Sequence, residues 1–344
     1  MFSARRMLSA AAVITAVATA AALSGPTAWA ADPYFKDKQI TFVIGFGAGG
    51  GYDAYARMLA PYFAEELGTD VVVVNQPGAG GMSTLNRMSN VPEGNLRMTI
   101  INGTGAGLQQ LLDMKGVKFD LAKFPILGII DHARWIWLVK NDSSIETPAD
   151  AIKSESVINW AGYGRISGIS DGAAMTCHAL ALKCKVVIGY KGSRAAALAI
   201  AQGEMDALYV SETSAYNYVK AKNARAIATM NRDRSILFPD LPTVFEAVPN
   251  LSKEQQWWLD YRATLEGLGR ILAVAPDTPP EAVQKLRAAT HKILNDPKVV
   301  AEADKKKRYI KYIPADKAGE MIQTVLNSAT PEQKTKIREV VLGQ

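Results

Sequence analysis

Cysteine and histidine are scarce in this sequence, and their scarcity limits metal chemistry. The 344 residues include two cysteines, Cys177 and Cys184, and three histidines. Tetrahedral metal sites need several such ligands close together, and only His178 lies near the cysteine pair. We therefore expect no metal and no cofactor. In an oxidising compartment the two cysteines can close a small disulfide loop, and the sequence leaves a disulfide and two free thiols open as alternatives.

Apolar stretches long enough to span a membrane are absent after Ala30. Before it, Arg5 and Arg6 precede an alanine-rich run over 7–23, and residues 28–30 read Ala-Trp-Ala, a small-x-small cleavage pattern. This order predicts a signal peptide over residues 1–30, cleaved after about Ala30, and a soluble, exported mature protein. A transmembrane anchor is the alternative, but the run is short for a bilayer and no stop-transfer cluster follows it.

A strong charge of one sign is also missing. The formal net charge is +6, and the predicted leader supplies part of it through Arg5 and Arg6. The densest basic run, residues 305–308, has no interleaved aromatic residues, so we interpret it as a solvated helix end. We expect no nucleic-acid partner.

What the sequence does contain is a regular alternation of strand and helix patterns. Helical spacing of apolar residues is clear over 52–67 and over 280–294, which begins with a proline. Such alternation predicts an α/β fold in which parallel sheets carry helices on both faces. The expected strands are 40–44, 71–74, 98–101, 125–130, 136–139, 157–160, 186–188, 207–210, 226–230 and 271–275.

Two places in the chain indicate crossings between two sheets. One is the stretch 125–139, which polar residues interrupt at 131–134, and the other is 271–275, which precedes a proline pair. Two crossings imply two lobes, that is, two doubly wound sheets joined by a hinge. We expect the first lobe to hold residues 31–133 and 271–344, and the second lobe to hold residues 134–270.

Two glycine-rich turns near the mature N-terminus give the strongest indication of function. Strand 40–44 runs into residues 45–53, Gly-Phe-Gly-Ala-Gly-Gly-Gly-Tyr-Asp, and strand 71–74 runs into residues 75–81, Asn-Gln-Pro-Gly-Ala-Gly-Gly. A strand that enters a helix through glycines directs bare backbone N–H groups and the positive end of the helix dipole at one point, which favours an anion. On adjacent parallel strands, the two turns would border one cleft at the carboxyl edge of the sheet.

The first turn also matches the dinucleotide pattern G-x-G-x-x-G over residues 45–50. Three observations weaken that interpretation. Asn75 stands where an acidic residue is expected, Asp53 would place a negative charge beside a pyrophosphate, and exported proteins rarely meet nicotinamide cofactors. Asp53 itself is open to two roles, as a helix N-cap and as a ligand contact.

Residues 168–172, Gly-Ile-Ser-Asp-Gly, fit the nucleophile elbow of hydrolases, so a secreted serine hydrolase using Ser170 is the alternative function. However, the expected strand ends several residues earlier, and the nearest histidine, His178, lies on the helix that Ser170 opens. The other interpretation is a third glycine and hydroxyl loop over 163–170. In that loop Ser167 or Ser170 caps the helix and donates to an anion, and Arg165 is either a carboxylate contact or a surface charge.

A further turn over residues 189–194 and the strand end 211–213 are expected to face the same cleft. Lys191 and Arg194 are interpreted as loop cations, which solvent surrounds more often than a ligand does. The tryptophans at 135, 137, 257 and 258 are interpreted as core or lobe-interface packing and not as a ligand box.

The order of these motifs resembles the TctC or Bug family, the substrate-binding proteins of tripartite tricarboxylate transporters. The resemblance rests on the two glycine turns, on Tyr190-Lys191-Gly192, on residues 203–206 (Gly-Glu-Met-Asp) and on residues 238–243 (Phe-Pro-Asp-Leu-Pro-Thr). It implies a periplasmic-binding-protein-like fold that closes over a small organic carboxylate and delivers it to the membrane permease subunits of such a transporter. We expect a monomer without catalytic activity.

The loops and the resemblance together predict the ligand-binding residues. They are Phe46, Gly47, Ala48, Gly49, Gly50, Tyr52, Asp53, Pro77, Gly78, Ala79, Gly80, Tyr163, Arg165, Ser167, Ser170, Tyr190, Gly192 and Glu212. The family usually has threonine or a similar small residue where Tyr52 stands, and its second-lobe loop usually contains a histidine that this chain lacks before His178. Tyr52 and Tyr163 therefore favour a bulkier or aromatic acid as an alternative to a di- or tricarboxylate.

Overall fold

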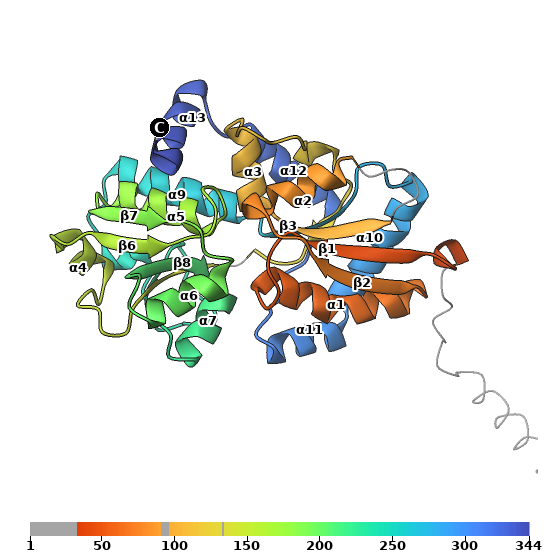
Figure 1. Cartoon of the computed structure of the whole chain (residues 1–344), viewed down its shortest axis with the longest axis horizontal. Coiled ribbons are helices and arrows are strands. Elements are labelled where there is room, and N and C mark those ends of the chain that lie inside the picture. Colours follow the sequence, from red (N-terminus) through yellow and green to blue (C-terminus); the bar gives the residue numbers. More distant parts are fainter. Residues whose placement is uncertain (1–32, 91–95, 133, 344) are drawn as a thin grey trace, which may run out of the picture.

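The structure is a computed structural model that describes residues 33–90, 96–132 and 134–343. Within these residues two sheets lie side by side, and each carries helices on both faces (Figure 1). The expected α/β fold with two doubly wound sheets is therefore confirmed. The predicted signal peptide, residues 1–30, lies outside the described residues. No helix in the described part is long and apolar enough to cross a membrane.

The first sheet has six strands in the order β11-β4-β10-β3-β1-β2. Strands β1, β2 and β3 run parallel to one another. Strand β10 is antiparallel to both β3 and β4, and β11 is antiparallel to β4. The bounds are β1 (Gln39–Ile44), β2 (Asp70–Asn75), β3 (Arg97–Asn102), β4 (Ile126–Ile129), β10 (Arg270–Val274) and β11 (Ile313–Pro314).

The second sheet has five strands in the order β7-β6-β8-β5-β9. Strands β6, β7 and β8 run parallel, whereas β5 is antiparallel to both β8 and β9. The bounds are β5 (Trp135–Val139), β6 (Ile158–Ala161), β7 (Cys184–Val187), β8 (Ala207–Ser211) and β9 (Arg225–Thr229).

All ten expected strands are present, but the expectation of parallel sheets is partly wrong. In each sheet the strand that enters after a crossing, β5 or β10, runs antiparallel to its neighbours. The rule that a helical crossover joins parallel strands applies only to two strands of the same sheet. Strand β5 follows β4, and β10 follows β9, and the members of each pair belong to different sheets. The rule therefore does not fix the direction of these two strands.

Helices cover both faces of each sheet. In the first sheet, α1, α10 and α11 pack on one face while α3 and α12 pack on the other; in the second sheet, α5 and α9 lie opposite α6 and α7 (Figure 1). The helices predicted over 52–67 and 280–294 are α1 and α10. The bounds are α1 (Gly51–Leu67), α2 (Met82–Met88), α3 (Gly103–Leu111), α4 (Pro148–Lys153), α5 (Ile169–Ala179), α6 (Ser193–Ala201), α7 (Glu212–Lys220), α8 (Val244–Ala247), α9 (Lys253–Glu266), α10 (Pro280–Asn295), α11 (Pro297–Lys305), α12 (Ala315–Leu326) and α13 (Pro331–Leu342).

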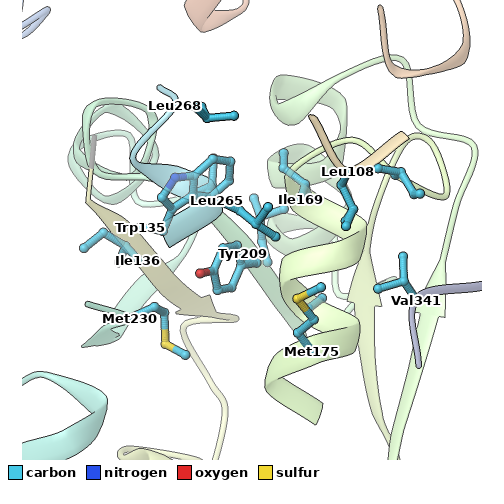
Figure 2. Packing of buried hydrophobic residues seen from close by; sticks show 14 of the residues in the cluster. Leu108, Trp135, Ile136, Ile169, Met175, Tyr209, Met230, Leu265, Leu268 and Val341 are labelled. Carbon is cyan, nitrogen blue, oxygen red and sulfur yellow. The ribbon is translucent and has the colours of Figure 1, made fainter. Parts of the chain in front are cut away.

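The apolar core continues from the second sheet to one face of the first. Figure 2 shows Trp135 of β5 and Tyr209 of β8 packed among side chains of α5 and α9, such as Ile169 and Leu265. The same cluster of buried residues includes Leu108 of α3, which covers the first sheet. Burial of apolar surface is the main stabilising contribution to folding, so this continuous cluster holds the two sheets together as observed.

The last helix, α13, lies against the second sheet's helix α5 (Figure 1). Arg165, in the loop before α5, donates from Nη1 to the carbonyl oxygen of Leu342 over 3.1 Å. The chain end therefore contacts the half of the molecule that the sequence assigns to the second lobe.

The structure also decides between the two alternatives for the cysteines, because Cys177 of α5 and Cys184 of β7 form a disulfide.

Candidate functional site

A cavity lies between the two sheets, where loops from both of them meet. Its empty volume is about 750 Å³, part of which is open solvent. The first sheet contributes the loop 46–52, Asn102 at the end of β3 and Arg270 at the start of β10. The second sheet contributes Tyr163, the turn 191–194 and the edge formed by β5 and β8. Open α/β sheets hold their ligands at this edge, outside the carboxyl ends of the parallel strands.

Asp53 does not line the cavity, but it holds the first glycine loop in place through a hydrogen bond with Gly49. Its carboxylate accepts a hydrogen bond from the Gly49 backbone N–H over 2.9 Å and another from Arg57 Nε over 2.9 Å. Burial opposes the charge of Asp53, but these hydrogen bonds outweigh it and lower the pKa of the carboxyl group. Asp53 therefore stays ionised and holds the loop, and the N–H of Gly49 is already satisfied.

Other backbone amides of the same loop remain open. Within the described residues, the N–H groups of Ala48 and Gly51 donate to no acceptor, and both residues line the cavity. Gly51 is the first residue of α1, a helix of 17 residues whose N-cap, Gly50, offers no side-chain cap. The positive end of the helix dipole therefore faces the cavity beside unpaired donors, which favours an anion at this point.

The second glycine loop packs mainly against the loop 163–170 of the other sheet. Gly80 has a left-handed backbone (φ 66°), and a Cβ atom there would lie 2.6 Å from the carbonyl oxygen of Ile166. Gly80 and Phe46 line a smaller neighbouring cavity of about 240 Å³. The other predicted residues of this loop, Pro77, Gly78 and Ala79, line neither cavity.

Two residues of the third predicted loop line the main cavity, Ile169 and Tyr163, and only Tyr163 is polar. Its hydroxyl donates to the Ser167 carbonyl oxygen over 3.0 Å, and its ring meets the Phe46 ring edge-on with centroids 6.1 Å apart. Ser167 and Ser170 are buried outside the cavity wall, where their hydroxyl groups lie 3.3 Å apart. Arg165 is held by the Leu342 carbonyl oxygen, as described above.

The hydrolase interpretation requires a general base at Ser170. Among the described residues, no histidine forms a hydrogen bond with Ser170, whose hydroxyl pairs with Ser167. His132 lies beside Gly269, the His178 ring lies against Trp258, and the His291 ring lies against Tyr312. Strand β6 also ends well before α5 begins, so the strand–turn–helix geometry of a nucleophile elbow is missing here.

Of the remaining predicted residues, one lines the cavity and two form hydrogen bonds elsewhere in the protein. Gly192 lines the cavity, whereas the Tyr190 hydroxyl donates to Glu204 over 3.4 Å outside it. Glu212 is buried and accepts a hydrogen bond from the Ser235 hydroxyl over 2.6 Å. Glu212 is therefore a structural acceptor next to the crossing between the sheets. The predicted residues that do line the main cavity are Phe46, Gly47, Ala48, Gly50, Tyr52, Tyr163 and Gly192.

The charged side chains that line the cavity, among the described residues, are Lys191, Arg194 and Arg270, and all three are cations. Lys191 and Arg194 were interpreted from the sequence as solvated loop cations, and Arg270 was missed. Arg270 had a signal in the sequence, since it is a single cation at the start of an otherwise apolar strand. A charge is buried in such a position only when a partner or a ligand compensates it.

Arg270 is compensated by Asp131. Its Nη1 lies 2.8 Å from Oδ1 and 2.6 Å from Oδ2 of Asp131, and its Nη2 donates to the Ser211 hydroxyl over 3.3 Å. Burial opposes the positive charge, but the Asp131 carboxylate outweighs it and raises the pKa of Arg270 above its ordinary value. The guanidinium therefore stays protonated while it lines the cavity.

An aromatic pair forms part of the wall beside the glycine loop. The rings of Phe46 and Tyr52 are stacked with centroids 4.4 Å apart, and the Arg270 guanidinium lies 5.3 Å from the Tyr52 ring. Burial raises the pKa of Tyr52, so its phenol stays neutral and keeps its proton. The cavity therefore combines flat apolar surface with one phenolic donor and several cations.

A buried acidic residue, Glu266, lies at the end of α9 just before the chain enters β10. Its Oε2 accepts from Asn231 Nδ2 over 3.0 Å, its Oε1 accepts from the Tyr209 hydroxyl, and Arg262 Nε lies 3.5 Å from Oε1. Burial raises the pKa of Glu266 to about 7, although Arg262 acts in the opposite direction.

This raised pKa predicts a pH-dependent stability. The folded state binds the Glu266 proton more tightly than the unfolded state does. The stabilisation that this proton gives to the folded state is therefore complete below the ordinary pKa of a glutamate, and it is lost as the pH rises through about 7. We expect the loss to be at most about 3 kcal/mol in the free energy of unfolding. Urea denaturation from about pH 5 to about pH 8 measures it. Glu266→Gln should flatten the profile, and Glu254→Gln, an exposed change on the same helix, should not; equal slopes in both variants would contradict the assignment.

A cavity between two doubly wound sheets is the arrangement of the periplasmic-binding-protein-like fold, and solved structures share this fold. The fold is similar to that of R. palustris Rpa4515 with adipate, with a TM-score of 0.72, 18% identity and coverage of 89% of this chain and 98% of that one. It is also similar to MatC from Rhodopseudomonas palustris with bound malate, with a TM-score of 0.70, 20% identity and coverage of 89% and 100%.

The chain belongs to the tripartite tricarboxylate transporter receptor family, TctC, whose model matches residues 55–331. A UPF0065 protein encoded in the gbd 5' region of Cupriavidus necator is 30% identical over 305 residues, which cover 85% of this chain and 86% of that protein. A UPF0065 protein of Bordetella pertussis is 26% identical over 290 residues, covering 83% and 84%. The family resemblance seen in the sequence is therefore confirmed.

Proposed function

We propose that this protein captures a small organic carboxylate between its two sheets and delivers it to the membrane permease subunits of a tripartite tricarboxylate-type transporter. Residues 1–30 direct it to the periplasm, where it acts as a monomer and without catalysis. We assign residues 31–133 and 271–344 to one lobe and residues 134–270 to the other, with α13 (Pro331–Leu342) at the chain end packed on α5 of the second lobe. The ligand stabilises a closed arrangement of the lobes because it contacts loops from both of them.

The positive charge of the cavity wall is the observation that supports this proposal most directly. In the described residues, every charged side chain of the wall is a cation, and open N–H groups of the glycine loop face the same space. An anion is the ligand that such a wall attracts, and a carboxylate matches the planar geometry of guanidinium groups. Two proteins of similar fold were solved with malate and with adipate, which supports the same ligand class here.

The aromatic pair supports a ligand with a flat or bulky body. The stacked Phe46 and Tyr52 rings give the glycine loop an apolar surface that a short acid would not cover. We therefore include aromatic acids together with di- and tricarboxylates in the proposed ligand class.

We expect carboxylates to stabilise the purified mature chain against thermal unfolding. A ligand that binds only the folded state, present at about 100 times its dissociation constant, adds about 2.7 kcal/mol to the free energy of unfolding. A thermal-shift screen of mono-, di-, tri- and aromatic carboxylates measures this effect, and isothermal titration calorimetry gives the affinity of each hit. The uncharged amides of the same acids are the control. A flat response to every acid would contradict the proposal.

A further inference from the structure

We propose that Arg194 is a specificity-determining residue, which binds a second acidic group of the ligand at the mouth of the cavity. The site then selects dianions over monoanions of the same length. This inference rests on the proposed capture of a carboxylate and assigns a role to a side chain in the first turn of α6, on the second sheet.

The three cations of the cavity wall differ in how they are compensated. Arg270 is buried and forms an ion pair with Asp131, in which Nη1 contacts both carboxylate oxygens. Lys191 and Arg194 are exposed, and neither forms an ion pair or a side-chain hydrogen bond with any residue of the described ranges. Since no acidic side chain lines the same part of the cavity, two positive charges remain unbalanced. A dianion matches that charge better than a monoanion does.

The position of Arg194 places it opposite the first sheet. A Cβ atom at Gly49 would lie 3.2 Å from Nη1 of Arg194, so this guanidinium lies against the first glycine loop. A Cβ atom at Gly51 would lie 3.4 Å from Nη2 of Arg270. The two guanidinium groups therefore approach one loop at positions that are two residues apart.

This arrangement leaves one role open for Arg194. The amides of Ala48 and Gly51 are available to a first carboxylate, and Asp131 already occupies Arg270 on one side. Arg194 is the guanidinium whose donors are all available, and it can bind a second carboxylate with two parallel hydrogen bonds. Lys191 is a point charge without such a fork, so it adds attraction but less geometric selection.

Adipate and hexanoate test the inference, because they share a chain of six carbon atoms and differ by one carboxylate. Titration calorimetry on the mature wild-type chain should give an affinity at least about 10-fold higher for adipate. Arg194→Gln should reduce this preference by about 10-fold and change the hexanoate affinity by less than about 3-fold. Arg194→Lys should retain part of the preference. Lys185→Gln removes one positive charge at an exposed position of β7 outside the cavity, so it should leave the preference unchanged.

Each contrary outcome identifies which claim is wrong. If the wild-type chain binds both acids equally, or if Arg194→Gln weakens both equally, Arg194 does not bind a second acidic group and the inference is wrong while carboxylate capture stands. An equal loss of preference in Lys185→Gln would show a general charge effect and would also overturn the role of Arg194. If no carboxylate of any length binds, the proposed function itself fails. The comparison of adipate with hexanoate on the wild-type chain needs no variant. It can therefore refute the inference even if Arg194→Gln does not fold.

Discussion

Arg270→Met should destabilise the protein more than any other single change considered for the cavity wall. The substitution would leave the Asp131 carboxylate, which is 3% exposed, with the Tyr55 hydroxyl at 3.2 Å as its remaining side-chain partner. Breaking one side of a buried ion pair costs about 3–5 kcal/mol, because an uncompensated charge stays in the interior. Urea denaturation at neutral pH measures the expected loss in the free energy of unfolding.

An exposed arginine–carboxylate ion pair is the control. Arg232 donates from Nε and Nη2 to the two oxygens of Asp260 over 2.7 Å each, but the two side chains are 55% and 42% exposed. Arg232→Met should therefore cost less than about 1 kcal/mol. Combining Arg270→Met with Asp131→Leu should recover part of the loss, because no unpaired carboxylate remains. Equal losses for the two arginine variants would show that Arg270 is not a compensated buried charge.

Arg270 also shows what could not be predicted from the sequence. Its partner Asp131 is 139 residues away along the chain, and the pair forms because both chain crossings between the sheets pass through the same place. The lone cation at the start of an apolar strand indicated a compensated charge but not its partner. The direction of β5 and β10 was missed for a related reason, since both strands enter their sheets from the other half of the molecule.

Local features were predicted well because nearby residues determine them. Glycines between an apolar strand and a helical pattern correctly place the loop 46–52 at the end of β1, and that loop lines the cavity. The second glycine loop has the same local signal, yet it packs against Ile166. Its position depends on a loop of the other sheet, and no spacing within 75–81 contains that information. The same limit applies to Arg165, whose partner is the far C-terminal helix.

Two hydrogen bonds between the first sheet and the loop 163–170 suggest how ligand capture and closure of the lobes are connected. Asn102 Nδ2 donates to the Ser167 carbonyl oxygen over 2.9 Å, and Gln109 Nε2 donates to the Ile166 carbonyl oxygen over 2.9 Å. Both bonds join the first sheet to the loop 163–170 of the second. Because Asn102 also lines the cavity, the ligand site and the contact between the first sheet and the loop 163–170 share a residue.

Gly80→Ala should weaken ligand binding by more than about 10-fold, because it keeps the two loops apart. The added Cβ atom would lie 2.6 Å from the Ile166 carbonyl oxygen, a distance that requires the backbone to move. The left-handed backbone adds strain of about 1 kcal/mol for a residue with a side chain. Affinity for the best acid of the screen, measured by calorimetry, and the radius of gyration with ligand present, measured by X-ray scattering, report the two effects separately.

Gly203→Ala separates the strain from the clash. Gly203 has a similar backbone, with φ at 78° against 66° for Gly80, but a Cβ atom there would meet nothing within 4 Å. Both variants should lose about 1 kcal/mol of stability through strain, whereas only Gly80→Ala should lose affinity and keep the larger radius of gyration when ligand is added. Wild-type affinity in Gly80→Ala would show that the contact between Gly80 and Ile166 is not needed for capture, and the closed arrangement would then have to depend on the cavity wall alone.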